Sequence, residues 1–494
     1  MVRWCEVPLE TSLPSSVLNA LRNPESGTCS LISIRDAHIF NTYSTQNMSD
    51  ISSLRPRVAL VTGAAGFIGM FMTKRLVHEN YHVLALIRGK GDKSAQRRLD
   101  ELKAAMGLDP IEAEQVHCVD CSLGATTDPD ALASVLKSAL DGLGAKRIDV
   151  VIHSAASLLQ DHDRMKEERR EGIRETNMAT NVGGTVALLG ALEKLMGGGS
   201  SPDVARIVRP SIVAGKESNT GMMAVVSFFG RSTWGVAHHR WCRLLAMLWK
   251  QLPMVGNPDG ILDIIDVNDV VTAMMAFVLA DDRDDTRVDR SRYTVGAVHY
   301  VSTAYVQGTR QGLLLEELVV GKEDYPGEKQ FNNSYEESKA LAEQAVFDWF
   351  NRLSKGKASE RFVVNNVTNQ HALTLQEWSL RLLRSIGCNI DARKLVWVQS
   401  RDELEEAVRK LRFGSGMLGN FWSLFWKRVY VLWPYLLRAS GTTFDTTNTK
   451  KCVGPMWTNK RVERYFSFQV KSFGPTTSIN PRRKVPIWKR VWCF

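Results

Sequence analysis

The stretch RVALVTGAAGFIG, Arg57 to Gly69, decides the fold of this chain. It begins with an apolar run, Val58 to Val61, that is typical of a strand and leads into a glycine-rich turn. The segment MFMTKRLVHEN then carries apolar residues at helical spacing, and YHVLALIR is a second apolar strand. Strand, helix and strand in this order predict a βαβ unit, and therefore an α/β fold built on a doubly wound parallel sheet.

The glycines of this turn each have a physical role if a dinucleotide binds there. Gly63 permits the tight turn, Gly66 lets the backbone approach a pyrophosphate, and Gly69 lets the helix pack close to the strand. The phosphates then lie at the helix N-terminus, where backbone N–H groups bind anions. We therefore expect a Rossmann-type cofactor site formed by Thr62, Gly63, Gly66, Phe67, Ile68 and Gly69.

The end of the second strand indicates which dinucleotide binds. Proteins that bind NAD usually have an acidic residue there, which contacts the ribose 2′-hydroxyl. This chain has Arg88 and Lys90 instead, and their positive charges suit a 2′-phosphate. We therefore expect NADPH as the cofactor. The alternative is an ordinary basic loop.

Later strand ends add further cofactor-binding candidates. Asp120 ends a third strand, at a place where an acidic residue commonly meets the adenine. The segment IDVVIHSAAS is a near-continuous apolar strand, typical of a buried parallel one, and it ends in small residues that allow close approach of the cofactor, namely Ser154, Ala155 and Ala156. Asn181 opens another helix in NVGGT, and we include it in this set.

The segment FNNSYEESKALAE holds Tyr335 and Lys339 four residues apart, on one face of a helix. A lysine ammonium beside a phenol is expected to lower the pKa of the tyrosine, which would favour a general acid able to protonate a carbonyl oxygen as hydride arrives. Upstream, the strand VHYVSTAYV ends in Ser302 and Thr303, and the Thr303 hydroxyl would hold the same oxygen.

We therefore predict Thr303, Tyr335 and Lys339 as catalytic residues. Lys339 could also bind the nicotinamide ribose, so Tyr335, Lys339 and Ser302 are counted among the cofactor-binding residues as well. The alternative is a solvated helix face.

These motifs together resemble the extended short-chain dehydrogenase/reductases, in particular their male-sterility branch, which includes fatty acyl-CoA reductases and thioester reductase domains. The resemblance spans Arg57 to Leu380 and rests on VTGAAGFIG, LIRGKGDKSAQRRL, VIHSAAS, NVGGT, YVSTAYV, NNSYEESKALAE, IVRPSIVAGKESNTG and IIDVNDVV. A weaker resemblance to the C-terminal part of the acyl-CoA reductases lies in GTTFDTTNT. The resemblance implies a smaller substrate-binding part, and three more cofactor-binding residues: Pro210, Ser211 and Ile212.

The order of two segments departs from that family. In the family, the strand ending in Ser-Thr and the Tyr–Lys helix precede the RPSIV strand, whereas here the RPSIV strand comes first. The blocks 206–297 and 298–360 therefore look exchanged, although each is intact. The helix after Asn181 would then lead to the RPSIV strand and skip one sheet position, which the later block must return to fill.

The region after RPSIV shapes the substrate pocket in this family. Here Met222 to Gly256 is rich in Met, Phe, Trp and Leu, which suits an acyl chain, although core packing explains any single residue as well. Arg240 and Arg243 could meet the phosphates of coenzyme A, or lie on a solvated face. The expected partner is an acyl-CoA or another acyl thioester.

The C-terminal region is aromatic and basic. Met417 to Leu437 is apolar except for a central Lys-Arg pair, and could lie in a membrane interface or form a buried helix pair. Gly441 to Phe494 carries 11 basic and 2 acidic residues, a net charge of +9 out of +10 for the whole chain. A basic tail can meet anionic lipid, or simply be solvated. Nothing in the chain resembles a nucleic-acid motif, so no nucleic-acid partner is expected.

Length and composition set the domain organisation. A chain of 494 residues is too long for one ordinary core, and we divide it into an N-terminal extension (1–55), an NADP-binding reductase domain (56–380) and a mostly helical, basic C-terminal region (381–494). Eight scattered cysteines and the lack of a signal peptide favour a reducing, intracellular compartment, with peripheral contact to an intracellular membrane as an option. No metal site and no clean membrane-spanning segment are expected.

The sequence thus predicts an NADPH-dependent reductase of acyl thioesters, acting on long-chain fatty acyl-CoA and yielding an aldehyde or a fatty alcohol. One alternative is an NADP-dependent dehydrogenase of the sterol or 3β-hydroxysteroid type, which shares the fold and the Tyr–Lys pair. Another is a non-catalytic, membrane-associated protein that only binds a nucleotide.

Overall fold

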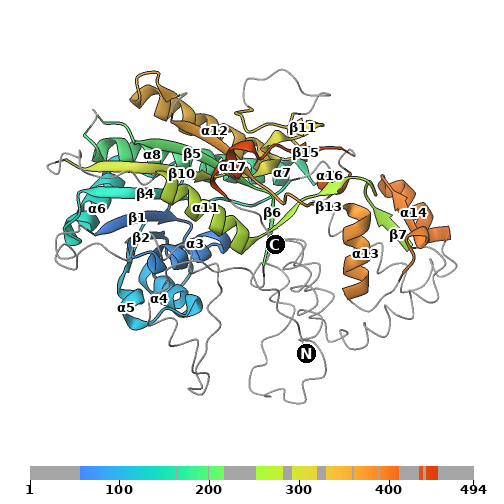
Figure 1. Ribbon diagram of the computed structural model, residues 1–494, viewed down its shortest axis with the longest axis horizontal. Coiled ribbons are helices and arrows are strands. Elements are labelled where there is room, and N and C mark those ends of the chain that lie inside the picture. Colours follow the sequence, from blue (N-terminus) through green and yellow to red (C-terminus); the bar gives the residue numbers. More distant parts are fainter. Residues whose placement is uncertain are drawn as a thin grey trace, which may run out of the picture. The chain divides into compact units, whose positions relative to one another are not determined.

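The computed structural model of the 494-residue chain describes ten stretches (Figure 1). They are residues 56–161, 165–197, 200–215, 252–281, 292–319, 330–358, 361–385, 390–410, 433–437 and 441–453. The N-terminal extension, the core of the predicted substrate region with Arg240 and Arg243, most of the 417–437 segment and the basic tail after 453 lie outside them.

The expected βαβ unit is present and continues into a parallel half-sheet. Its elements are β1 (Arg57–Thr62), α3 (Phe67–His78), β2 (Tyr81–Ile87), α4 (Ala95–Met106), α5 (Pro110–Glu114), β3 (Val116–Asp120), α6 (Pro129–Gly142) and β4 (Arg147–His153). All pairings among these strands are parallel, with β1 between β2 and β4 and with β3 next to β2. The strands are apolar and buried because helices cover both faces of the sheet.

The second half of the sheet is built from segments that are far apart in the chain. Its elements are α7 (Glu167–Asn177), the π-helical turn η2 (Met178–Gly183), α8 (Gly184–Leu195), β5 (Val204–Pro210), α11 (Val267–Asp281), β10 (Thr294–Val301), α12 (Ser334–Leu353) and β12 (Phe362–Val367). The complete sheet has seven strands in the order β12-β5-β10-β4-β1-β2-β3. This confirms the predicted fold class, a Rossmann-type doubly wound α/β sheet.

The strand order contains the skip that the sequence predicted. The chain leaves β4, passes over one sheet position to form β5, and returns through α11 to place β10 between them. The helix α11 packs against α3 on one face, whereas α8 and α12 pack with α6 on the other. A change of face is what right-handed crossovers require when the direction of travel along the sheet reverses.

The sheet lies between two layers of helices (Figure 1). A layer of apolar side chains packs on each of its faces. On one face, side chains of α3, α4 and α11, such as Met72, Leu99 and Val270, pack on the strands. On the other face, α6, α8 and α12 contribute side chains such as Leu136 and Phe350. Because apolar layers cover both faces, a ligand would reach the strands at their carboxyl edge and at the loops that follow them.

Short strands outside the main sheet form four two-stranded pairs among the described residues. The pairs are β6 (Ile212–Ala214) with β9 (Ile264–Asp266), β7 (Leu252–Val255) with β14 (Leu395–Val398), β8 (Ile261–Leu262) with β13 (Leu373–Thr374), and β11 (Leu313–Leu314) with β15 (Thr443–Phe444). The helices are α13 (Leu375–Ser385), α14 (Arg401–Lys410), α16 (Trp433–Leu436) and α17 (Thr447–Cys452), with 3-10 turns η3 (Ala304–Gln307) and η5 (Ala392–Lys394).

Elements from the C-terminal region pair with strands that come earlier in the chain. β14 extends β7, β15 extends β11, and α17 packs against β12 and α11. Whether residue 380 marks a domain boundary stays a prediction. No helix in the described stretches is long and apolar enough to cross a membrane.

Candidate active site

The glycine-rich turn after β1 leaves no room for side chains at two positions. Gly63 has φ +69°, and a Cβ there would lie 2.6 Å from the backbone nitrogen of Ala155. A Cβ on Gly69 would lie 2.1 Å from the carbonyl oxygen of Gly63. The turn therefore requires glycine at both places, as its predicted roles in tight turning and close helix packing demand.

The first turn of α3 is open to an anion. Gly66 is the N-cap residue and supplies no side chain, and neither Phe67 nor Ile68 nor any other residue of the first turn is acidic. A helix N-terminus with free N–H groups and a positive dipole end binds phosphate. These residues fit the diphosphate of a dinucleotide.

The basic residues lie where the ribose of a dinucleotide is expected. Ile87, the last residue of β2, pairs with Asp120, the last residue of β3. Arg88, which follows Ile87, and Asp120 therefore lie at the same edge of the sheet. Arg88 and Lys90 are exposed, and neither forms an ion pair with any residue that the structure describes. The guanidinium of Arg98 donates a hydrogen bond to the Arg88 carbonyl and holds this loop. Two exposed cations in this loop fit a 2′-phosphate.

A chain of buried hydrogen bonds joins the ends of β1 and β4. The Thr62 hydroxyl lies 2.6 Å from Nδ1 of His153, and Nε2 of His153 lies 2.9 Å from the Thr185 hydroxyl. Because Thr185 donates its own proton to the Asn181 carbonyl, its oxygen accepts from His153, and Nδ1 of His153 accepts from Thr62. Burial lowers the pKa of His153 to about 3, and the charge of Lys339 adds to this effect, so the imidazole is neutral.

The small residues after β4 lie against the phosphate turn, as predicted. Ser154 donates a hydrogen bond from its hydroxyl to the Thr62 carbonyl at 2.7 Å, and Ala155 donates its N–H to the Thr62 hydroxyl at 3.2 Å. Ala156 follows in the same loop. Asn181 fixes Ser157, the residue after Ala156. The Asn181 side chain accepts a hydrogen bond from the N–H of Ser157 and donates one to the Ser157 carbonyl.

Asn181 also links this loop to α12. Its amide donates a hydrogen bond to the Ser338 hydroxyl at 2.9 Å, and that hydroxyl donates to the carbonyl of Tyr335. The helix α12 begins at Ser334 because the side chain of Asn333 caps it, accepting from the N–H of Glu336 at 3.0 Å. The predicted cofactor residue Asn181 therefore positions the helix that carries the predicted catalytic pair.

Lys339 points from α12 onto the end of β10. Its Nζ donates a hydrogen bond to the Val301 carbonyl at 2.8 Å and lies 4.7 Å from the ring centre of Tyr300. The side chain is buried, and burial lowers the pKa of Lys339 to about 7, against a smaller opposing effect of Glu343. Its charge state therefore changes near neutral pH.

One expectation for Tyr335 was wrong. We expected its pKa to be lowered by Lys339, but desolvation, and next the charge of Glu336, raise the pKa of the Tyr335 phenol above its ordinary value. The reason is that burial acts on both partners, since it disfavours the phenolate and the ammonium alike. Tyr335 is therefore a protonated phenol at neutral pH, a form that can donate a proton but cannot act as a base.

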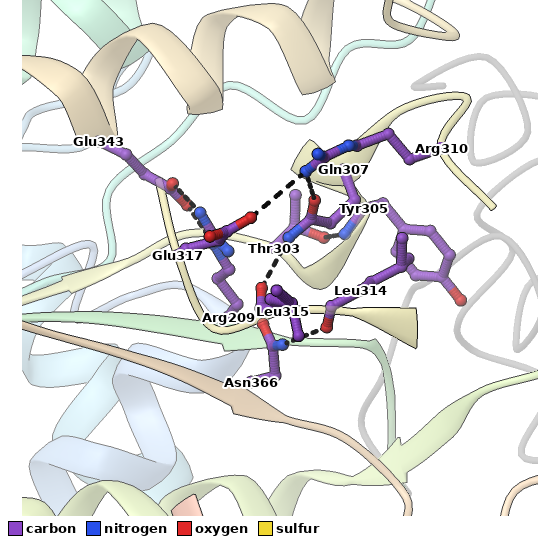
Figure 2. Close-up of polar contacts among 10 residues, drawn as sticks. All are labelled: Arg209, Thr303, Tyr305, Gln307, Arg310, Leu314, Leu315, Glu317, Glu343 and Asn366. Atoms are coloured by element: carbon purple, nitrogen blue, oxygen red, sulfur yellow. Dashed lines mark hydrogen bonds and ion pairs between the residues drawn. The ribbon is translucent and has the colours of Figure 1, made fainter. Parts of the chain in front are cut away.

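Ser302 and Thr303 follow β10 and lie beneath α12, which packs against η3. Ser302 donates its N–H to the Val208 carbonyl at 2.8 Å, and its buried hydroxyl has no hydrogen-bond partner among the described residues. The Thr303 hydroxyl accepts a long hydrogen bond, 3.4 Å, from the N–H of Tyr305 and caps η3 (Figure 2). Both hydroxyls can therefore still donate to a ligand.

Pro210, Ser211 and Ile212 end β5 and begin β6, at the same edge of the sheet. The Ser211 hydroxyl donates a hydrogen bond to the Asp263 carboxylate, and Ile212 donates its N–H to the Asp263 carbonyl. Contact between these residues and a cofactor stays a prediction.

Several residues that shape this site were missed by sequence reasoning. Thr185, His153 and Tyr300 line the Lys339 side of the sheet, and Arg209 and Glu343 form a buried ion pair beside it. The sequence did contain a signal for Glu343, because this residue stands four residues after Lys339 on the same helix face. The histidine gave no usable signal, since a neutral core histidine and a catalytic one look alike in a sequence.

A comparison with known families agrees with these motifs. Residues 61–195 and 291–355 match the model of the family described as male sterility protein. Over those two stretches the chain is similar to that family. They include the phosphate turn, Arg88, Asn181, Thr303, Tyr335 and Lys339, and the unmatched interval between them contains β5 and α11.

Solved structures give weaker likenesses. The terminal R domain of the myxalamid PKS-NRPS pathway is 13% identical with a TM-score of 0.41, over 85% of this chain and 92% of that one. UDP-glucose 4-epimerase from Thermotoga maritima is 12% identical with a TM-score of 0.37, over 84% and 98%. The dTDP-glucose 4,6-dehydratase from Bacillus anthracis, in complex with NAD, is 12% identical with a TM-score of 0.34, over 84% and 96%. At such values these likenesses carry nothing about activity.

Proposed function

We propose that this protein is an NADPH-dependent reductase of acyl thioesters. The observation that carries the proposal is the arrangement at the carboxyl edge of the sheet. Tyr335 and Lys339 lie on one helix, which Lys339 fastens to the end of β10 directly before Ser302 and Thr303. Because β1, β4 and β10 are parallel neighbours, the phosphate turn opens at the same edge.

The residues at this edge fit an NADP-type cofactor. The N-terminus of α3 would hold the diphosphate, and Arg88 with Lys90 would hold the 2′-phosphate. When bound, NADPH supplies a hydride. The Ser154–Ala156 loop and Asn181 would lie along its ribose and nicotinamide end.

The residues of this chain can carry out the proton side of the reaction. Tyr335, protonated at neutral pH, would donate a hydrogen bond and then its proton to the thioester carbonyl oxygen as hydride reaches the carbon. Thr303 would donate a second hydrogen bond to that oxygen. The resulting hemithioacetal loses its thiol by cleavage of the C–S bond, which leaves an aldehyde.

Lys339 would act on Tyr335 rather than on the substrate carbonyl. As an ammonium one helical turn away, it stabilises the negative charge that develops on the phenolate oxygen when the proton leaves. A second round of hydride transfer would convert the aldehyde to an alcohol with the same residues.

The choice of a long-chain fatty acyl-CoA as substrate comes from the resemblance and from the composition of 222–256. The aromatic and basic residues after Met417 support peripheral contact with an intracellular membrane, where a fatty acyl substrate partitions. Co-sedimentation of the full chain with phosphatidylserine vesicles checks this, and binding equal to that on neutral vesicles would contradict a role for the basic tail.

The decisive experiment incubates the protein with NADPH and palmitoyl-CoA and follows cofactor oxidation together with thiol release. We expect turnover that Tyr335→Phe lowers at least 100-fold, because the proton donor is lost. Tyr293→Phe is the matched control, since this tyrosine lies on the protein surface against Lys146 and Asp141. Activity of Tyr335→Phe equal to that of the control would contradict the proposal.

The same preparation separates the alternatives. Oxidation of a sterol with NADP⁺ and no thiol release from palmitoyl-CoA would identify a steroid-type dehydrogenase. Binding of NADPH without turnover of either substrate would identify a protein that only binds a nucleotide.

A further inference from the structure

A fully buried ion pair lies beside the predicted catalytic lysine. Arg209, near the end of β5, donates a hydrogen bond from Nε to a carboxylate oxygen of Glu343 at 2.8 Å, and a second from Nη2 to the other oxygen (Figure 2). The exposed fractions of the two side chains are 0% and 1%. The pair joins α12 to β5 across the apolar layer.

Glu343 and Lys339 stand on the same face of α12, one turn apart. Lys339 is fastened to β10 through the Val301 carbonyl, and Glu343 is fastened to β5 through Arg209. Since β5 and β10 are neighbours in the sheet, these two contacts fix both the position and the rotation of the helix over the strand ends.

Glu343 is the negatively charged group that favours the ammonium form of Lys339. Among the residues that the structure describes, the titratable groups that face Lys339 are Tyr335 and Glu343 from α12, Tyr300 from β10 and His153 from β4, and Arg209 from β5 stands behind Glu343. The imidazole is neutral and both phenols are protonated at neutral pH. Glu343 therefore provides the negative charge that favours the ammonium form against burial.

A purely structural role explains this pair poorly. Buried ion pairs contribute little net stability, because removing both charges from water costs about as much as their attraction returns. An apolar pair of similar volume would fill the same space. We propose that Glu343, held in place by Arg209, is a positioning residue that fixes Lys339 and keeps it charged in the reduction reaction.

This inference rests on the proposed function only for the role of Lys339 in catalysis, so its first test needs no turnover. In the full-length chain with 13C-labelled lysine, the titration of Lys339 is followed by NMR across pH 5 to 10, with its signal assigned by the Lys339→Met variant. In Glu343→Gln, which keeps a hydrogen-bond acceptor for Arg209 but removes the charge, the midpoint should move to lower pH by about one unit. An unchanged midpoint would overturn the proposal.

Asp281→Asn is the matched control. Asp281, the last residue of α11, forms a similarly buried pair with Arg206 of β5, on the opposite face of the sheet. The control reports the general effect of losing a buried carboxylate, and the Lys339 midpoint should stay where it is in the parent protein. An equal shift in both variants would show a nonspecific effect and would overturn the proposal.

If Glu343→Gln does not fold, a second variant still tests the proposal. The double change Arg209→Met with Glu343→Leu removes both charges and keeps the volume apolar. If it folds and Lys339 titrates as in the parent, the pair is only structural.

Turnover adds a second readout. If the parent reduces palmitoyl-CoA, the fall of kcat on the alkaline side should occur at lower pH in Glu343→Gln, and at the parental pH in Asp281→Asn. If the parent reduces no thioester, the proposed function fails, while the titration midpoint of Lys339 still decides this inference.

Discussion

At the scale of single residues, Lys339 and His153 show how burial sets charge in this site. Both side chains lie against the ring of Tyr300, with Nζ of Lys339 4.7 Å from its centre and the imidazole ring centre 5.4 Å from it. Burial lowers the pKa of Lys339 to about 7 and that of His153 to about 3. The charge of the lysine therefore changes near neutral pH, where the histidine is neutral.

The lowered pKa of Lys339 has a consequence for stability. Between pH 7 and 10.5 the unfolded chain keeps a proton on this lysine that the folded chain has lost, so the stability of the parent rises with pH in this window. Lys339→Met removes this dependence. We expect Lys339→Met to have a higher free energy of unfolding than the parent at pH 6. This difference should shrink by about 2–3 kcal/mol by pH 9.

Denaturant unfolding at the two pH values measures this difference. Lys450→Met, at an exposed lysine of α17, is the control and should change stability equally at both. A pH-independent effect of Lys339→Met would mean that Lys339 titrates in the folded protein as it does in the unfolded chain.

The candidate site residues could be singled out in the sequence because each stands at a fixed spacing from a partner. Tyr335 and Lys339 share a helix face, and the glycines follow a strand and precede a helix. The raised pKa of Tyr335 could not be predicted, since it depends on how deeply α12 packs, which is set by residues distant in the chain. His153 and Arg209 were missed for the same reason, because their partners come from other elements.

At the scale of elements, the turn between β1 and α3 depends on the loop after β4. Gly63→Ala would combine a strained φ of +69° with a Cβ 2.6 Å from the Ala155 nitrogen. We expect a loss of at least about 2 kcal/mol of stability and loss of NADPH binding, because either β4 or the phosphate turn must move.

Gly107→Ala is the control for this prediction. Gly107 ends α4 with φ +64° and has open space around its Cβ position, so strain alone should cost about 1 kcal/mol and leave NADPH binding intact. Urea unfolding and fluorescence titration with NADPH measure the two effects. Equal behaviour of the two variants would show that close approach to Ala155 is not what requires glycine.

At the scale of the whole molecule, the predicted exchange of two segments can be compared with the sheet. The predicted block boundaries fall after Ala205 in β5 and after Ala297 in β10, and the third falls directly before Arg361. Ala205 pairs with Val298 on one side and with Phe362 on the other, and its N–H donates to the Arg361 carbonyl. All three boundaries therefore lie at one level of the sheet.

This geometry makes the predicted exchange testable. In a rearranged chain, residues 298–360 would precede residues 206–297. The new joins would then connect neighbouring strands at that level of the sheet, and only the first residues of these strands would change place. We expect it to bind NADPH with a dissociation constant within about threefold of the parent and to refold faster, because β10 would directly follow β4 in space and in sequence. Loss of binding would show that the present order is required.

The skipped strand position could be predicted from the order of motifs, because parallel strands with right-handed crossovers allow few arrangements. The pairing of β14 with β7 and of β15 with β11 could not. Those strands are two to four residues long, and nothing in so short an apolar run identifies a partner more than a hundred residues away.

The most direct test of the thioester reductase proposal is the ratio of NADPH oxidised to thiol released from palmitoyl-CoA. We predict one NADPH per thiol if the product is the aldehyde and two if it is the alcohol, with both signals lost in Tyr335→Phe. Oxidation of NADPH without release of thiol, or release of thiol that does not depend on NADPH, would contradict it.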